Sequence, residues 1–223
     1  MKKESLILLD TNICIYRTLA YVQPKIYRTE LDEVTNKIDS LSNNNFKCNI
    51  VISNLVISEL KNNSILFWEI NNFCFIRLHV RNKYQVLKIF NQAKKSMGKF
   101  ISKYSISQEL EENIKNYPLN LQEIDQFYLK FPQKLQSLTH TKIKNISNPR
   151  QKQIKISQRP NDLPEETDRK LLCQAIEIKK LHHSDVYIFS CDGDFTEFVN
   201  EIPLEFGINI LKLGDTIPSC GED

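Results

Sequence analysis

The chain has 223 residues, 41% hydrophobic and 26% charged, which is typical of a globular protein with a sizeable core. The net charge is +3, but the charge is distributed unevenly along the chain. Residues 77–159 carry 17 lysines and arginines and 5 acidic residues, a balance of +12. Residues 160–223 carry 5 lysines and arginines and 14 acidic residues, a balance of −9. No run approaches the roughly 18 apolar residues of a membrane span, and the amino terminus is too short and too acidic for a signal peptide, so a cytoplasmic location is expected.

Cysteine and glycine spacing narrows the class of protein further. The six cysteines form no Cys-x-x-Cys pair and several lie inside apolar runs, so reduced, buried thiols are expected. The five glycines form neither a dinucleotide-binding fingerprint nor a P-loop, which argues against a dinucleotide or nucleoside-triphosphate enzyme.

The first elements alternate between strand and helix. Residues 5–9 form a continuous apolar run, typical of a parallel strand covered on both faces, and residues 12–22 and 27–41 have helical character. A second strand is predicted over 49–52. Alternation of this kind is typical of an α/β fold.

A short helix is predicted over 55–62, with Asn54 as its expected N-cap. Residues 73–78 combine aromatic and β-branched side chains and therefore predict a third strand.

The pattern changes between about 80 and 160, where the chain becomes lysine-rich with helical periodicity. We interpret this segment as a basic, mainly helical insertion. Its last part, 139–161, is polar with only isolated isoleucines, which predicts a mobile loop or a weak hairpin.

The remaining segment returns to alternation, with a helix over 167–181, a strand over 186–190, a short helix over 194–200 and a strand over 208–213. The chain is therefore predicted to be a single α/β domain, residues 1–223, with a mainly parallel sheet and the insertion within it.

Acidic residues follow two of the buried strands directly. Asp10 comes after residues 5–9, and Asp192 comes after residues 186–190. Because the carboxyl ends of parallel strands share one edge of a sheet, and ligands bind there in open α/β sheets, these two carboxylates are expected to lie close together.

Two more acids lie on the apolar stripes of predicted helices. Glu59 follows Leu55 and Val56 by four and three residues, and Asp168 precedes Leu171 and Leu172 by three and four, so both are expected to point inward. The alternatives are a surface role for Glu59 and a favourable helix-dipole position for Asp168, with Glu165 and Glu166 as nearby rivals. Asp194 is predicted either to support the same cluster or to be the N-cap of the helix that follows it.

Such a cluster is costly unless a cation neutralises it, because buried carboxylates lose hydration and repel one another. All the candidate ligands are carboxylate oxygens, which favours Mg²⁺ or Mn²⁺. These ions activate water and stabilise charge on phosphoryl groups, so hydrolysis of a phosphodiester is the expected reaction.

The acidic segments resemble the four ordered blocks of PIN-domain nucleases. They are residues 8–12 (LLDTN), 53–60 (SNLVISEL), 167–175 (TDRKLLCQA) and 190–195 (SCDGDF). The resemblance covers roughly residues 5–78 and 163–214. It implies a three-layer α/β/α fold with a five-stranded parallel sheet in the order 3-2-1-4-5.

The resemblance also implies a metal-dependent endoribonuclease, often the toxin of a toxin–antitoxin pair, with a protein antitoxin or a second copy of the chain as partner and no membrane. Asp10, Glu59, Asp168 and Asp192 would hold the metal, and Asp194 would support them. Thr11, Asn12 and Ser190 would bind the neighbouring acids through hydroxyl or amide groups.

The insertion departs from compact members of this family and leaves the substrate open. Its aromatic residues interleave with lysines, as base stacking over a phosphate-tracking groove requires, or they form the core of the insertion. These aromatics are Tyr84, Phe90, Phe100, Tyr104, Tyr117, Phe127, Tyr128 and Phe131. The residues predicted to bind nucleic acid are Lys94, Lys95, Lys99, Lys103, Lys142, Lys144, Arg150, Lys152, Lys155 and Arg159.

We therefore predict a Mg²⁺- or Mn²⁺-dependent ribonuclease. Two alternatives are an inactive RNA-binding scaffold and a structure-specific DNA nuclease on the same fold.

Overall fold

The computed structural model describes residues 5–22, 29–42, 48–76, 79–115, 120–138, 140–142, 154–156 and 163–215. The strands are β1 (Ser5–Leu9), β2 (Cys48–Val51), β3 (His140–Lys142), β4 (Ile154–Ile156), β5 (Val186–Phe189) and β6 (Asn209–Leu211). The helices before the basic segment are α1 (Thr11–Val22), α2 (Thr29–Ser42), α3 (Asn54–Lys61) and α4 (Asn63–Ile76). The later helices are α5 (Lys83–Tyr104), α6 (Gln108–Lys115), α7 (Leu121–Leu129), α8 (Pro132–Ser137), α9 (Glu166–His182), α10 (Gly193–Thr196) and α11 (Glu201–Phe206).

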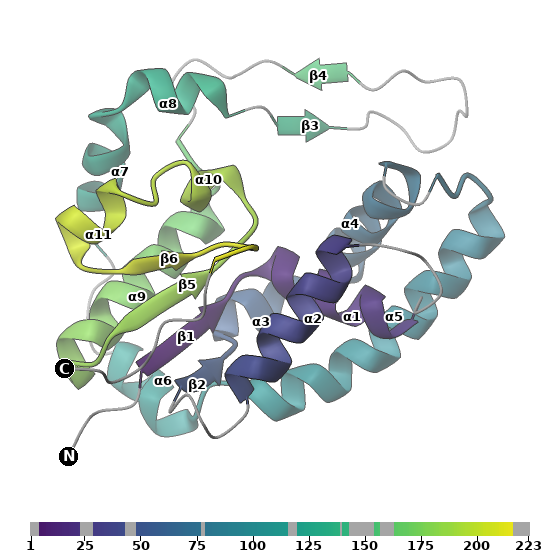
Figure 1. Cartoon of the computed structure of the whole chain (residues 1–223), viewed down its shortest axis with the longest axis horizontal. Helices are drawn as coiled ribbons and strands as arrows, with labels where there is room; N and C mark the ends of the chain where they lie inside the picture. The colour runs from purple at the N-terminus through teal and green to yellow at the C-terminus, as the bar shows by residue number, and fades with distance from the viewer. Residues whose placement is uncertain are drawn as a thin grey trace.

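A four-stranded parallel sheet forms the centre of the molecule, in the order β2-β1-β5-β6. β1 pairs with both β2 and β5, and Leu8 lies opposite Val51 on one side and Ile188 on the other. Helix α2 lies in front of the sheet and α9 behind it (Figure 1). The α/β class and the parallel sheet are confirmed.

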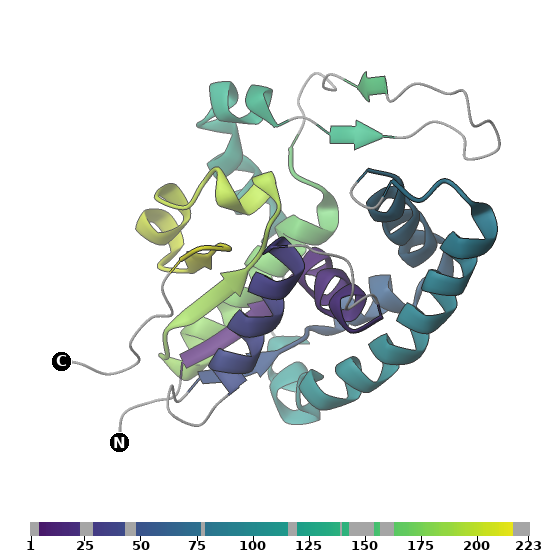
Figure 2. The ribbon, with the colours of Figure 1, turned by 45° about the vertical axis from the view of Figure 1, so that its right-hand side comes forward.

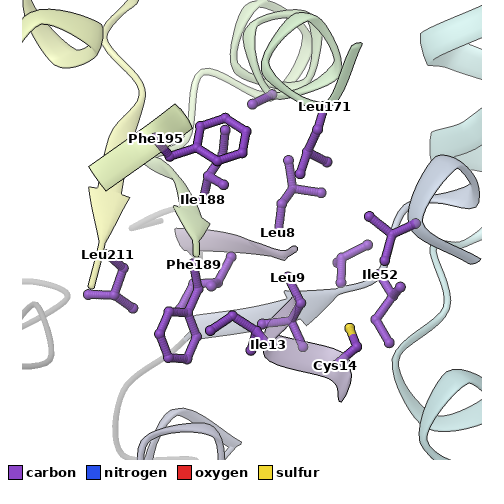
Figure 3. Close-up of a cluster of buried hydrophobic side chains, with 14 of the residues drawn as sticks. Leu8, Leu9, Ile13, Cys14, Ile52, Leu171, Ile188, Phe189, Phe195 and Leu211 are labelled. Atoms are coloured by element: carbon purple, nitrogen blue, oxygen red, sulfur yellow. The ribbon is translucent and has the colours of Figure 1, made fainter. Parts of the chain in front are cut away.

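Alternation along the central strands sends side chains to both helical layers. Leu8 and Ile188 point toward Leu171 of α9, whereas Leu9 and Phe189 lie on the side of Ile13 of α1 (Figure 3). All of these side chains are buried. The continuous apolar runs of β1 and β5 therefore exist because both faces of each strand are covered.

The predicted strand over 73–78 is wrong in the part that the structure describes, because α4 extends to Ile76. Leu66, Ile70, Phe73 and Cys74 are buried at helical spacing, and α4 packs between α3 and α5. The burial of these side chains in helical packing outweighs the β propensity of this aromatic segment.

The expected edge position beside β2 is instead marked by a single parallel bridge between Ile52 and Ser105. The amide of Ile52 donates to the carbonyl of Tyr104 at 2.6 Å, and the amide of Ile106 donates to the carbonyl of Ile52 at 3.1 Å. The five strands predicted for the sheet are thus reduced, in the described residues, to four strands and this bridge.

The basic segment is helical, as predicted, but its helices pack into the rest of the molecule. Helix α5 packs against α1 and α4, and α7 packs against α9. In both views α5 runs along one flank with α1 beside it (Figures 1 and 2). Strands β3 and β4 form an antiparallel pair within the segment predicted as a loop or weak hairpin.

Two smaller features complete the fold. Of the cysteines in the described ranges, Cys14, Cys74 and Cys173 are buried and Cys48 and Cys191 are partly buried, whereas Cys220 lies outside those ranges. Helix α11 was not predicted from the sequence.

No helix among the described residues is long and apolar enough to cross a bilayer.

Candidate functional site

The carboxyl ends of β1 and β5 bring Asp10 and Ser190 side by side. The amide of Asp10 donates to the carbonyl of Phe189 at 3.1 Å, which continues the β1–β5 ladder by one residue. The hydroxyl of Ser190 donates to Oδ2 of Asp10 at 2.6 Å, although 180 residues separate them. Both residues are buried, so the expected shared edge of the sheet is present.

Two further donors hold the Asp10 carboxylate. The amide of Thr11 donates to Oδ1 at 2.6 Å, and Nδ2 of Asn12 donates to Oδ2 at 2.8 Å. These donors and the Ser190 hydroxyl fix the orientation of a carboxylate that has almost no contact with solvent.

Asn12 also fastens the segment that carries Asp192. Its Oδ1 accepts from the amide of Cys191 at 3.2 Å, and the amide of Asp192 donates to the Ser190 hydroxyl oxygen at 2.9 Å. Asn12 and Ser190 therefore couple the turn after β1 to the turn after β5.

Glu59 reaches the same edge from α3. Its Oε2 accepts from the hydroxyl of Thr11 at 2.5 Å. Helix α3 is positioned by Ser53, whose side chain accepts from the amide of Val56 and is the N-cap in place of the predicted Asn54. Thr11 thus connects two acids that are 49 residues apart in sequence.

Asp168 lies in the first turn of α9 and is half-buried, whereas Glu165 and Glu166 are exposed and Glu166 pairs with Lys170 at 2.5 Å. Burial raises the pKa of Asp168 well above its usual value, and repulsion from Asp10, Asp192 and Asp194 raises it further. Of the three acids considered for this position, Asp168 is the one that is not exposed.

Asp192 and Asp194 have different environments. Asp192 is exposed and is the N-cap of α10, with Oδ1 accepting from the amide of Asp194 at 3.2 Å, so the predicted capping role of Asp194 is wrong. Asp194 is buried, and its Oδ2 accepts from the amide of Glu165 at 3.4 Å. Its carbonyl accepts from the Tyr128 hydroxyl at 3.0 Å, which ties α7 to this turn.

Glu69 of α4 is an acid near the cluster that the sequence analysis missed. Burial raises its pKa to about 7, and repulsion from Asp192, Glu165, Glu59 and Asp10 adds to the shift. The available signal was an isolated acid within the apolar run Ile65–Ile76, but that run was not assigned to a helix.

Burial and repulsion from a neighbouring acid also raise the pKa of Asp10. Burial and the charge of Asp192 raise its pKa to about 7, although hydrogen bonds from Ser190 and Thr11 oppose the shift. Within the described ranges no lysine or arginine forms an ion pair with Asp10, Glu59, Asp168 or Asp192. The cluster is therefore not neutralised by those cations.

A hard divalent cation suits this donor set chemically, because the set consists of carboxylate oxygens, and because burial and neighbouring acids oppose the ionisation of Asp10 and Asp168. The arrangement is nonetheless open: among the described residues, no three His, Cys, Asp or Glu side chains are grouped so as to hold a metal ion. Charge and donor type fit an ion, whereas a complete protein coordination shell is absent from these residues.

The lysines predicted to bind nucleic acid divide into two groups. Lys94, Lys95, Lys99 and Lys103 are exposed on α5. The others lie on β3 and β4, of which the backbone alone is described, or outside the described residues; these are Lys142, Lys155, Lys144, Arg150, Lys152 and Arg159.

Most of the aromatic residues of this segment belong to the core. Phe127 and Tyr128 are buried, Tyr104 is nearly so, and Phe90, Phe100 and Phe131 are partly buried, so stacking on bases is wrong for the buried ones. Tyr84 is 84% exposed, and Tyr117 lies outside the described residues.

Comparisons of the chain with protein-family models, with curated proteins and with solved structures give no match. The resemblance to PIN-domain nucleases therefore rests on the four acidic blocks quoted above and on the residues around them.

Proposed function

We propose that the chain is a divalent-metal-dependent nuclease of the PIN type that hydrolyses RNA phosphodiester bonds. The observation that carries the proposal is the hydrogen-bonded link between Asp10 and Ser190, which joins the first and last acidic blocks. Glu59 joins them through Thr11, the charge of Asp192 acts on Asp10, and the charges of Asp10 and Asp192 act on Asp168.

The residues that would hold the ion are Asp10, Glu59, Asp168 and Asp192, with Asp194 in support. A bound Mg²⁺ or Mn²⁺ would supply an activated water and would stabilise negative charge on the phosphoryl group. Because Asp192 is exposed, its carboxylate is accessible to an incoming ion and to a phosphate.

The neighbouring residues orient this set. Ser190, Asn12 and the amide of Thr11 fix the plane of the Asp10 carboxylate, and the Thr11 hydroxyl fixes Glu59. Glu69 adds negative charge nearby, which favours binding of a cation. Supporting hydrogen bonds of this kind commonly change metal affinity or activity by about 10- to 100-fold when removed.

The test is incubation of the purified chain with labelled single-stranded RNA and Mn²⁺. We expect cleavage that EDTA abolishes, and we expect Asp10→Asn and Asp192→Asn each to reduce it by more than about 100-fold. Asp192→Asn is the variant expected to disturb folding less, because asparagine caps a helix about as well as aspartate does and because the side chain of residue 192 is exposed. The matched control is Asp32→Asn, an exposed acid of α2.

A second readout is the Mn²⁺-induced rise in melting temperature, which mass action predicts for the parent chain and not for Asp192→Asn. RNA that stays intact with the parent chain, while the protein binds it, would favour the inactive scaffold. Preferential cutting of branched DNA would favour the structure-specific DNA nuclease.

A further inference from the structure

Helix α5 has the most one-sided charge of the described helices. Its 22 residues include six lysines and no aspartate or glutamate. The lysines are Lys83, Lys88, Lys94, Lys95, Lys99 and Lys103. The described part of the chain contains no ion pair to any of them. The positive charge of this helix is therefore available to a ligand.

One line of exposed side chains runs along α5. Tyr84, Lys88, Asn91, Lys95 and Lys99 follow one another at intervals of three or four residues, so they share one face of the helix, and all five are exposed. We call this set the lysine face. Lys88 and Lys99 are separated by about 16 Å along the axis.

The opposite face of α5 is fixed in the core. Val86, Ile89, Ala93 and Met97 are buried on a helix that packs on α1 and α4. The Tyr104 hydroxyl and the Ser42 hydroxyl share a hydrogen bond of 2.8 Å at the end of the helix. The lysine face is thus held on a rigid element and is oriented before a ligand arrives.

The composition of the lysine face favours a nucleic-acid strand over a protein or a membrane. Protein interfaces are depleted in lysine and have an apolar centre, whereas Asn91, which lies between Lys88 and Lys95 on this face, is polar. Insertion into a membrane needs an apolar helix face, and the apolar face of α5 is buried against α1.

Tyr84 distinguishes a single strand from a duplex. It is 84% exposed, and the side chain of Asn82 caps the helix at this point by accepting from the Tyr84 amide at 2.9 Å. An exposed ring in line with cationic side chains is the arrangement by which proteins stack unpaired bases while they track the backbone.

We infer that the lysine face binds a single-stranded nucleic acid, with Lys88, Lys95 and Lys99 on the phosphates and Tyr84 stacked on a base. The inference rests on the proposed nuclease function for its choice of ligand. At about 3.4 Å per phosphate, the distance from Lys88 to Lys99 corresponds to about five nucleotides of a stacked strand. Helix α5 packs on α1, and its last residue, Tyr104, accepts from the amide of Ile52 directly after β2, so the lysine face lies on a helix that ends beside the sheet.

The experiment measures binding of the full chain to a fluorescein-labelled single-stranded RNA of about 20 nucleotides in EDTA, by anisotropy over a KCl series. Lys88→Gln, Lys95→Gln and Lys99→Gln are combined in one variant. We expect its affinity to fall at least about tenfold and the slope of log K against log[KCl] to shrink by about 2, since each phosphate contact contributes about 0.7. The control combines Lys61→Gln, Lys130→Gln and Lys180→Gln, three exposed lysines outside α5.

A second variant tests the aromatic contact. Tyr84→Ala is expected to weaken binding of the single strand by about 5- to 100-fold with an unchanged salt slope, to leave duplex binding unaltered, and to be rescued by Tyr84→Phe. Equal affinities for the two triple variants would overturn the inference. The inference would also be overturned if the triple variant of α5 lost affinity for polyglutamate and kept its affinity for RNA, because the lysine face would then bind an acidic protein.

Failure of this inference and failure of the proposed function are separable, because binding is measured without metal. A chain that cuts RNA in Mn²⁺ but binds equally well in both triple variants contradicts the lysine face alone. A chain that binds through α5 and does not cut contradicts the nuclease proposal alone.

Discussion

Glu69 and Asp10 are acids whose surroundings in the fold oppose ionisation. For both, burial is the largest cause of a pKa near 7, followed by the charge of Asp192. Asp10 differs in that hydrogen bonds from Ser190 and Thr11 stabilise its ionised form. Glu69 shows no such compensation among the causes of its shift, so its ionisation opposes folding most directly.

We expect Glu69→Gln to stabilise the metal-free protein above about pH 7 and to have little effect at about pH 5. The folded state holds the Glu69 proton up to a pKa of about 7, whereas the unfolded state releases it near the usual 4.5. Parent stability is therefore greatest below the unfolded value and declines as pH rises to about 7. The side chain is partly accessible, so screening reduces the effect and a gain of about 1 to 2 kcal/mol is expected.

Urea unfolding at about pH 5 and pH 8 in EDTA measures this effect, with Glu109→Gln as the exposed control. A variant that is equally stable to the parent at both pH values would show that Glu69 is not strained by the cluster. The acids that act on it are Asp192, Glu165, Glu59 and Asp10.

At the scale of single elements, N-cap residues and glycines affect the stability of individual helices. Ser53 caps α3 and Asp192 caps α10, so two of the four acidic blocks each contain the N-cap residue of a helix. Gly98 is different, because it lies in the interior of α5 and an added Cβ would meet no atom within 4 Å. Glycine in a helix interior loses more backbone entropy on folding than alanine does.

Gly98→Ala is therefore expected to stabilise the protein by about 0.5 to 1 kcal/mol. Thermal unfolding measures the gain. The comparison is Gly193→Ala, where the new Cβ would lie 2.9 Å from Cδ2 of the buried Leu138, and where we expect no gain. A loss of stability in Gly98→Ala would mean that α5 is not a regular helix at this position.

At the scale of the whole molecule, the basic segment and the acidic carboxyl-terminal segment are held together by an aromatic cluster and by ion pairs. The ring of Phe127 in α7 lies 4.9 Å from Phe206, 5.4 Å from Phe131 and 6.2 Å from Phe198. Lys130 pairs with Glu205 and Lys134 with Glu201, each at 2.6 Å. Surface pairs of this kind contribute little, so the aromatic cluster is the stronger connection.

Phe127→Ala is expected to destabilise the protein by about 3 to 5 kcal/mol, because it leaves a cavity among rings from α7 and the carboxyl-terminal helices. Tyr84→Ala removes an aromatic from the same segment at an exposed position and should change stability by less than about 0.5 kcal/mol. Urea denaturation distinguishes them. Similar small effects for both would mean that α7 is loosely attached.

The sequence alone determined the parts of this protein where local pattern and tertiary environment agree. The strands predicted over 5–9, 49–52, 186–190 and 208–213 became β1, β2, β5 and β6. The apolar run of β1 is continuous because both faces of this strand are covered. Asp10 and Asp192 were predicted to share an edge of the sheet; there Ser190 donates to Asp10, and the charge of Asp192 acts on Asp10.

The tertiary structure alone decided the remainder. Residues 73–76 became helix because α3 and α5 cover the buried side of α4, and this burial outweighs a β propensity worth about 1 kcal/mol at most. Glu69 lies near the acidic cluster because residues 63–76 form a helix. Phe127 is buried because α7 packs on α9 and because its ring contacts Phe206 of α11. A side chain's propensity is a local quantity, whereas its burial depends on which distant segments pack against it, and burial contributes the larger free energy.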